Sequence, residues 1–100
     1  MANEFRPFFE HSIYVPTAKF DTDSVRRVAA ACGGCTVISS AGGAWVSPEG
    51  ELVSEPVHIL KAIGCGYQTP ASIRAIEQHL LAHGEEAVLI TRQAIDVIGI

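Results

Sequence analysis

The sequence predicts an α+β fold of the ferredoxin-like type, in which two helices cover one face of an antiparallel sheet. Two segments with helical spacing of apolar residues alternate with segments rich in β-branched and aromatic residues. A hairpin signal between the helices gives the order β-α-β-β-α-β, followed by an additional C-terminal strand. The chain is 48% hydrophobic and 18% charged, which suits a single domain over residues 1–100 with its own core.

The first strand is expected over residues 8–15, where aromatic and β-branched residues precede Pro16. A helix should follow, with Asp21 as its N-cap and Gly33 in the left-handed conformation after its last turn. Spacings of three and four predict its apolar face: Val25, Val28, Ala29 and Cys32.

The middle of the chain predicts a hairpin. Its turn is expected at residues 47–50, where Pro and Gly stand at positions that a type I turn favours. The strand segments around it are 36–38, 44–46 and 52–63. Gly42-Gly43 suggests a bulge or a break in the first strand, and Pro56 indicates an edge position or a kink in the second.

A second helix is expected after Thr69, the predicted N-cap, with Pro70 as its first residue. Its buried face is predicted at Ile73, Ile76 and Leu80, and its end at His83-Gly84. His79 and His83 share one face, but Leu80 stands where a zinc protease motif requires Glu. We therefore expect both histidines to face water.

The C-terminal residues predict two strands, 87–91 and 95–100, joined by a tight turn near Arg92-Gln93. The second of these segments carries a single charge. A free apolar strand at a sheet edge favours pairing with another chain. We therefore expect a homodimer, or strand addition to a partner, with three residues at the interface: Ile95, Val97 and Ile98.

Charge and composition restrict the classes of function. The net charge is −4, and the seven Lys and Arg residues are scattered, so direct nucleic-acid binding is disfavoured. The N-terminus does not resemble a signal peptide, and no apolar run reaches the ~20 residues that span a bilayer. We expect a cytoplasmic protein without a membrane segment.

Three cysteines, an odd number, do not predict a disulfide framework. Cys32-Gly33-Gly34-Cys35 has the spacing of a redox pair or half a zinc site. Cysteine is often simply buried, so we interpret both residues as structural and predict no metal and no cofactor. The alternatives are redox chemistry and a metal-linked site through Cys32, Cys35 and Cys65.

A contact surface is predicted on the face of the sheet that the helices leave uncovered. Three ring side chains come from three predicted strands: Tyr14, Trp45 and His58. Three carboxylates lie in or near the hairpin: Glu49, Glu51 and Glu55. Aromatic residues with polar groups are typical of protein interfaces. Trp45 in the core is the alternative, because the strand register cannot be followed across Gly42-Gly43.

Several short features occur together along the chain: Tyr14-Val15-Pro16, Gly34-Cys35-Thr36, Gly43-Ala44-Trp45, Gly50, Glu55-Pro56-Val57 and Glu85-Glu86-Ala87-Val88. In these features the chain resembles small uncharacterised proteins of phages and mobile elements with a ferredoxin-like α+β domain. The resemblance implies the fold and a mobile-element origin. None of the features is a catalytic signature, so no site residue is carried over.

These observations predict a non-enzymatic interaction module that binds a protein through an acidic, aromatic-containing surface. The resemblance to mobile-element proteins implies a specific form, an inhibitor of a host or defence protein. The alternative is a small-molecule-binding protein or a small dimeric enzyme, with a pocket on the open sheet face near Tyr14, Glu55 and His58. A deep pocket with convergent polar groups favours the alternative, and a flat acidic face favours the module.

Overall fold

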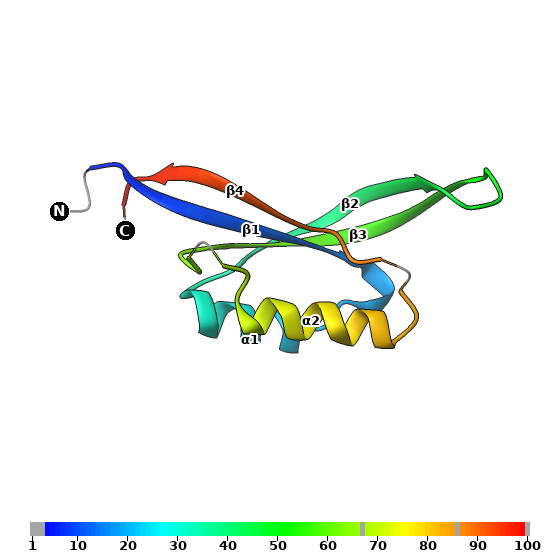
Figure 1. Cartoon of the computed structure of the whole chain (residues 1–100), viewed down its shortest axis with the longest axis horizontal. Helices are drawn as coiled ribbons and strands as arrows, with labels where there is room; N and C mark the ends of the chain where they lie inside the picture. Colours follow the sequence, from blue (N-terminus) through cyan, green and yellow to red (C-terminus); the bar gives the residue numbers. More distant parts are fainter. Residues whose placement is uncertain (1–3, 67, 86, 100) are drawn as a thin grey trace.

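The computed structural model describes residues 4–66, 68–85 and 87–99. Its elements are β1 (Arg6–Pro16), a 3-10 turn η1 (Thr17–Lys19), α1 (Thr22–Cys32), β2 (Thr36–Val46), β3 (Leu52–Ile63), α2 (Ala71–Ala82) and β4 (Ile90–Val97). The strands form one antiparallel sheet in the order β2-β3-β1-β4. Both helices lie on the same side of this sheet (Figure 1). The protein is therefore α+β, in an arrangement compatible with the predicted ferredoxin-like fold.

Helix α1 has the start, end and buried face that its sequence predicts. The Asp21 side chain accepts a hydrogen bond from the backbone N–H of Ser24 at 2.7 Å, and this contact holds the pKa of Asp21 below its ordinary value. Gly33 closes the helix at φ 86°, a conformation that glycine adopts without a Cβ penalty. Val28 and Cys32 are buried against the sheet.

Helix α2 begins one residue later than predicted. Pro70, not Thr69, is the N-cap, and its carbonyl accepts hydrogen bonds from the backbone N–H groups of Ile73 and Arg74. The extended ψ of Pro70, 152°, is the conformation of a residue outside the helix that starts its hydrogen-bond ladder. The predicted buried face is confirmed by Ile73, Ile76 and Leu80, and His83 caps the C-terminus.

The predicted pair of C-terminal strands is wrong. Residues 90–97 form the single strand β4, and Arg92 and Gln93, the expected turn, pair with His11 and Glu10 of β1. β1 spans eleven residues, so β4 can pair along it without a turn. No further strand follows β4 among the described residues. Two residues named in the sequence analysis, Glu86 and Ile100, lie outside the described residues.

β2 is one continuous strand with a bulge. The sequence predicted a bulge or a break at Gly42-Gly43, but the irregularity lies earlier in the strand. The register with β3 shifts between Ile38 and Ala41, where the strand holds one extra residue and Ser40 adopts φ 62°. An extra residue reverses the inward and outward alternation of side chains beyond it. The bulge thus decides which face of the sheet carries Trp45.

The core lies between the helix layer and the inner strands. Its buried members are Ile13, Val15, Val28, Cys32, Leu60, Ala62, Ile73, Ile76 and Leu80. Two partly buried residues pack against this cluster: Phe20, which precedes the N-cap of α1, and Val25, in the first turn of the helix. The core thus consists of the predicted helix faces and every second residue of β1 and β3.

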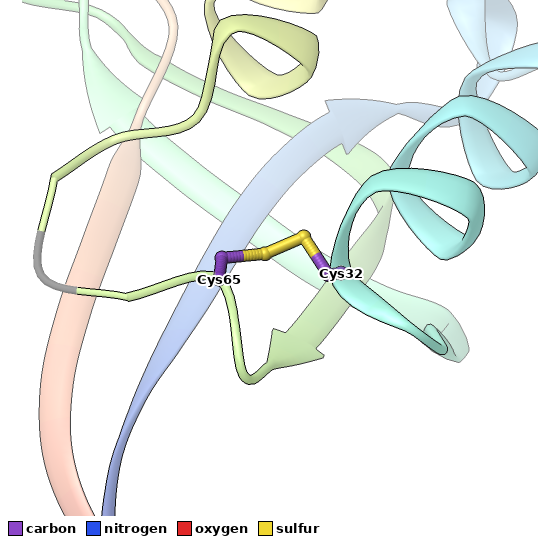
Figure 2. Close-up of a disulfide and its surroundings, with 2 residues drawn as sticks. All are labelled: Cys32 and Cys65. Atoms are coloured by element: carbon purple, nitrogen blue, oxygen red, sulfur yellow. A yellow bond between two sulfur atoms is a disulfide. The ribbon is translucent and has the colours of Figure 1, made fainter.

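Two of the three cysteines form a disulfide, contrary to the expectation that none is paired. Figure 2 shows Cys32, the last residue of α1, bonded to Cys65, which follows β3. Their Cα atoms are 4.7 Å apart, although 33 residues separate them in sequence. Because both sulfurs are consumed, the metal site through Cys32, Cys35 and Cys65 is not formed. Cys35 is free and partly buried, and this burial raises the pKa of its thiol.

Candidate binding surface on the uncovered sheet

The strand register assigns each side chain to a face of the sheet. Ile13 and Leu60 are register partners in the core and mark the face toward the helices. Since side chains alternate along a strand, Tyr14 and its partner Ile59 point to the opposite face. We call this opposite face the open face, because both helices lie on the other side of the sheet (Figure 1).

A two-stranded extension leaves the body of the molecule at one end. Pairing of β1 with β3 stops at Pro16 and Val57, so the earlier residues of β3 pair with β2 alone. We call residues 42–56, the paired ends of β2 and β3 with their turn, the hairpin arm. The molecule measures 53 × 23 × 22 Å, and the arm reaches beyond the end of the helix layer (Figure 1). Pro56 lies in this arm, where β3 lacks one neighbour and tolerates a residue without an N–H group.

The arm carries uncovered apolar side chains on both of its faces. Trp45, 45% exposed, is opposite Val53 on the open face. Val46 and Leu52 are opposite each other on the helix side, and they are 66% and 72% exposed because no helix extends beneath them. The alternative that Trp45 belongs to the core is therefore excluded, since the bulge in β2 turns its side chain outward.

The open face continues the apolar surface from the arm toward the body of the sheet. Ile38, Ile59 and Tyr14 are successive register partners across β2, β3 and β1, so they form a row on one face. We call these three residues the row. Ile38 is 39% exposed, and the other two are half-buried. Lys61 lies beside the row, two residues after Ile59 in β3. Its Nζ forms an ion pair with Glu10 Oε1 at 3.2 Å.

The three predicted carboxylates lie in the arm. Glu55 is opposite Gly43 on the open face, whereas Glu49 lies in the exposed turn and Glu51 follows it. Residues 41–60 contain these three carboxylates and neither Lys nor Arg. The arm therefore carries apolar side chains on both faces, two carboxylates at its tip, and a third, Glu55, on its open face.

His58 lies on the helix side, contrary to the expectation that it shares a face with Tyr14 and Trp45. It is the register partner of core residue Val15. Its ring stacks on Phe20 with centroids 4.1 Å apart, and its Nδ1 is hydrogen-bonded to Thr17 Oγ1 at 3.0 Å. His58 thus joins β3 to η1 and does not converge with the open-face side chains.

The predicted interface residues of the C-terminus lie at the opposite end of the molecule from the arm. Ile95 is opposite Phe8, Val97 is opposite Arg6, and Ile98 follows the strand with 48% exposure. β4 is an edge strand, with β1 as its one neighbour in the sheet. Its position is compatible with strand addition, and the role of these residues in a homodimer stays a prediction.

Two surface grooves in the described part of the chain are lined by residues other than Tyr14, Glu55 and His58, the polar groups expected in the small-molecule alternative. One groove of about 400 Å³ lies between α1 and α2, lined in part by Asp21, Arg27 and His79. The other, of similar volume, lies between β1 and β4 around Phe8 and Ile95. In the described residues, no three His, Cys, Asp or Glu side chains gather closely enough to hold a metal ion.

His11 is a buried polar residue that the sequence analysis did not identify. It is 1% exposed, and neither ring nitrogen has a hydrogen-bond partner within the described part of the chain. Burial, together with the nearby positive charge of Arg92, lowers the pKa of His11. The sequence does contain a signal for this burial, because His11 is spaced by two and four residues from the core residues Ile13 and Val15 and so lies on the same face of β1.

We expect His11 to destabilise the fold in acid. Its pKa in the folded protein is below 6.5, the value of an unperturbed histidine, so below that pH the unfolded chain binds a proton that the folded protein does not. The free energy of unfolding should therefore fall as the pH drops below about 6.5. In His11→Leu the free energy of unfolding should depend less steeply on pH, by at most about 1.4 kcal/mol per pH unit. Urea unfolding at a series of pH values tests this, and equal slopes for the two proteins contradict it.

Compared with known proteins, the chain matches no family model, and no curated protein is significantly similar to it. Neither helix of the described residues is long and apolar enough to span a bilayer.

Proposed function

We propose that this chain is a non-enzymatic protein-interaction module whose binding surface is the hairpin arm and the adjoining open face. The observation that carries the proposal is the exposure of Trp45, Val46 and Leu52 on both faces of the arm. The order β2-β3-β1-β4 with two helices on one face supports the ferredoxin-like fold in this proposal.

Physical chemistry favours a covering partner for the arm. A two-stranded hairpin is marginally stable in water unless a third strand or a packed layer supports it. Exposed apolar side chains that gather in one region mark interaction sites on folded proteins. Trp45 adds an indole, a group enriched at the energetic centre of protein interfaces.

The acidic tip indicates the chemistry of the partner. Glu49 and Glu51 lie at the end of the arm, in a stretch without Lys or Arg. Carboxylates around an apolar centre match a partner that carries basic residues around an apolar pocket, and they speed association at low salt. The resemblance to mobile-element proteins adds the more specific proposal that the partner is a host or defence protein that this chain inhibits.

A pull-down with matched variants tests the proposed function. Leu52→Asp and Trp45→Ala should each lose at least about 90% of the captured partner, because truncation of a central interface residue costs about 2 kcal/mol or more. Leu81→Asp is the control: Leu81 is also an exposed leucine, 40% accessible, but it lies on α2. Capture should also weaken at moderate salt.

Equal capture by the wild type, the arm variants and the control contradicts the proposal. Far-UV circular dichroism and thermal unfolding of each variant show whether the fold is retained. Since Leu52 is 72% and Trp45 45% exposed and neither belongs to the core cluster, both variants should unfold within a few degrees of the wild type.

A further inference from the structure

We infer that two copies of this chain pair through their β4 strands, antiparallel about a two-fold axis at Ala94, so that Arg92 of each copy lies opposite Asp96 of the other. The two four-stranded sheets then form one continuous sheet, with the helices of both copies on the same side. The inference goes beyond the proposed function, because the arm belongs to β2 and β3 and is a separate surface from β4.

β4 has a regular edge that is open to solvent. Its eight residues pair with β1 without a bulge, and β1 is its one neighbour among the described strands. Residues 91–94 and Asp96 are exposed. A long free edge of this kind is a template for another strand. The other edge strand, β2, is interrupted by its bulge and by two glycines, features that disfavour pairing at an edge.

The backbone of β4 restricts how a second strand can pair with it. Tyr14 donates its N–H to the carbonyl of Leu89 at 3.1 Å, and in an antiparallel ladder such hydrogen-bonded pairs recur at every second residue. The odd-numbered residues of β4 therefore turn their N–H and C=O groups toward β1. Arg92, Ala94 and Asp96 turn theirs toward the free edge. A second β4 can form hydrogen bonds only in a register that places these even-numbered residues opposite one another.

One of the registers that this rule allows is complementary in charge. An axis at Ala94 places Arg92 opposite Asp96 twice, once in each direction. An axis at Arg92 or at Asp96 would place like charges opposite each other. An axis at Gln93 or at Ile95 would leave both charges opposite uncharged residues. Opposite charges stabilise directly paired strands and like charges destabilise them, so the sequence of β4 favours the axis at Ala94.

The two charged side chains lie on the face where they can meet. Arg92 is the register partner of His11, so it lies on the helix side, and Asp96 has the same parity. The Cζ atom of Arg92 is 5.5 Å from the centroid of the Phe9 ring, and its five N–H donors permit an ion pair besides this contact. Asp96 is exposed and forms no ion pair with the described residues.

The same axis covers an exposed apolar side chain. Ile98 follows β4 and is 48% exposed. In a pairing centred on Ala94, Ile98 lies level with Ile90 of the other copy, a residue that packs against the core cluster. The paired strands thus continue the apolar helix side of the sheet beyond each charged pair.

Exchanging the charges tests the inference. At about 100 µM the wild type should have twice the single-chain mass of 10.7 kDa in light scattering coupled to size-exclusion chromatography, because weaker association has little binding free energy. Arg92→Asp and Asp96→Arg should each have the mass of one chain, since each places like charges opposite each other twice. An equimolar mixture of these two variants should recover the dimer mass, as should the double variant, because opposite charges then face each other again. Leu81→Asp on α2 and Leu52→Asp in the arm are controls that should stay dimeric.

A cysteine at the axis tests the register. Ala94→Cys, combined with Cys35→Ala to remove the free thiol, should cross-link two copies when oxidised glutathione is added. Directly opposite residues in a hydrogen-bonded antiparallel pair have Cα atoms about 5.5 Å apart, within the range of a disulfide. Ala44→Cys in the same background is the matched control, because Ala44 is an exposed alanine on the other edge strand and should stay uncross-linked. A non-reducing gel measures the cross-linked fraction.

Ala94→Pro repeats the dissociation test if a charge variant does not fold. It removes an N–H group that faces the free edge, so the ladder with β1 should persist while the pairing of two copies is lost. Circular dichroism of each variant shows whether the fold is retained.

Three results overturn the inference: a monomeric wild type, a dimer that persists in the folded charge variants or in Ala94→Pro, or cross-linking at residue 44 in place of residue 94. A monomeric wild type whose Leu52→Asp variant loses the captured partner overturns the β4 pairing alone and leaves the proposed function standing. A dimer with the expected charge dependence, whose Leu52→Asp variant captures the partner normally, supports the pairing and contradicts the proposed function.

Discussion

Replacing Cys65 by alanine should lower the free energy of unfolding by roughly 3–4 kcal/mol, because the unfolded chain regains the entropy that closing a loop of this length removes. The bond joins Cys32 at the end of α1 to the connection between β3 and α2, 33 residues later. Reduced and unfolded, the chain gains the conformational freedom that this link removes. For a domain of this size the melting temperature should fall by roughly 15–25 °C.

Thermal unfolding with and without a reductant measures the effect. The wild type with reductant should approach Cys65→Ala, and the variant itself should not respond to reductant. Cys35→Ala is the matched control, because Cys35 is partly buried but has a free thiol. Alkylation of the oxidised protein followed by peptide mapping should label Cys35 alone. A variant as stable as the wild type contradicts the prediction, as does labelling of Cys32.

The second large effect concerns two adjacent leucines of α2. Leu80 is 2% exposed within the core cluster, whereas Leu81, the next residue, is 40% exposed. Leu80→Ala should cost about 2–5 kcal/mol, because it removes buried methyl groups and leaves a cavity. Leu81→Ala should change stability by less than about 1 kcal/mol, since alanine is the best helix former and little buried surface is lost.

Urea unfolding of both alanine variants at neutral pH checks this pair. Because alanine replaces leucine at neighbouring positions of one helix, helix propensity cancels and the difference reports burial. Similar losses for the two variants would show that the face of α2 toward the sheet is not the one described here.

The helices and the hairpin turn were predictable because local sequence decides them. The Asp21 cap, the Gly33 end and the apolar spacing of Val28 and Cys32 each act within a few residues, and the structure confirms all of them. The same holds for the turn, where Gly50 donates its N–H to the carbonyl of Ser47 at 2.9 Å. The N-cap of α2 was predicted at Thr69 but lies one residue later, at Pro70, because both residue types are acceptable at the start of a helix.

The candidate site was predictable only in part, because faces of a sheet depend on register. Tyr14 and Trp45 do lie on the open face, but Trp45 does so through an extra residue at Ser40 that no residue type in β2 announces. His58 was expected beside them, yet β3 has no bulge and its parity places His58 with the core. A one-residue difference between paired strands is invisible until both are aligned.

By itself, the sequence determined the class of fold, the two helices with their buried faces, the hairpin turn and the acidic character of the arm. All of these follow from periodicity, capping residues and charge within short stretches of chain. Only the tertiary structure decided that Cys32 meets Cys65, that β4 is one strand, and that β2 and β3 extend past the helices with Val46 and Leu52 uncovered. These features depend on which distant segments lie side by side, and sequence spacing carries no such information.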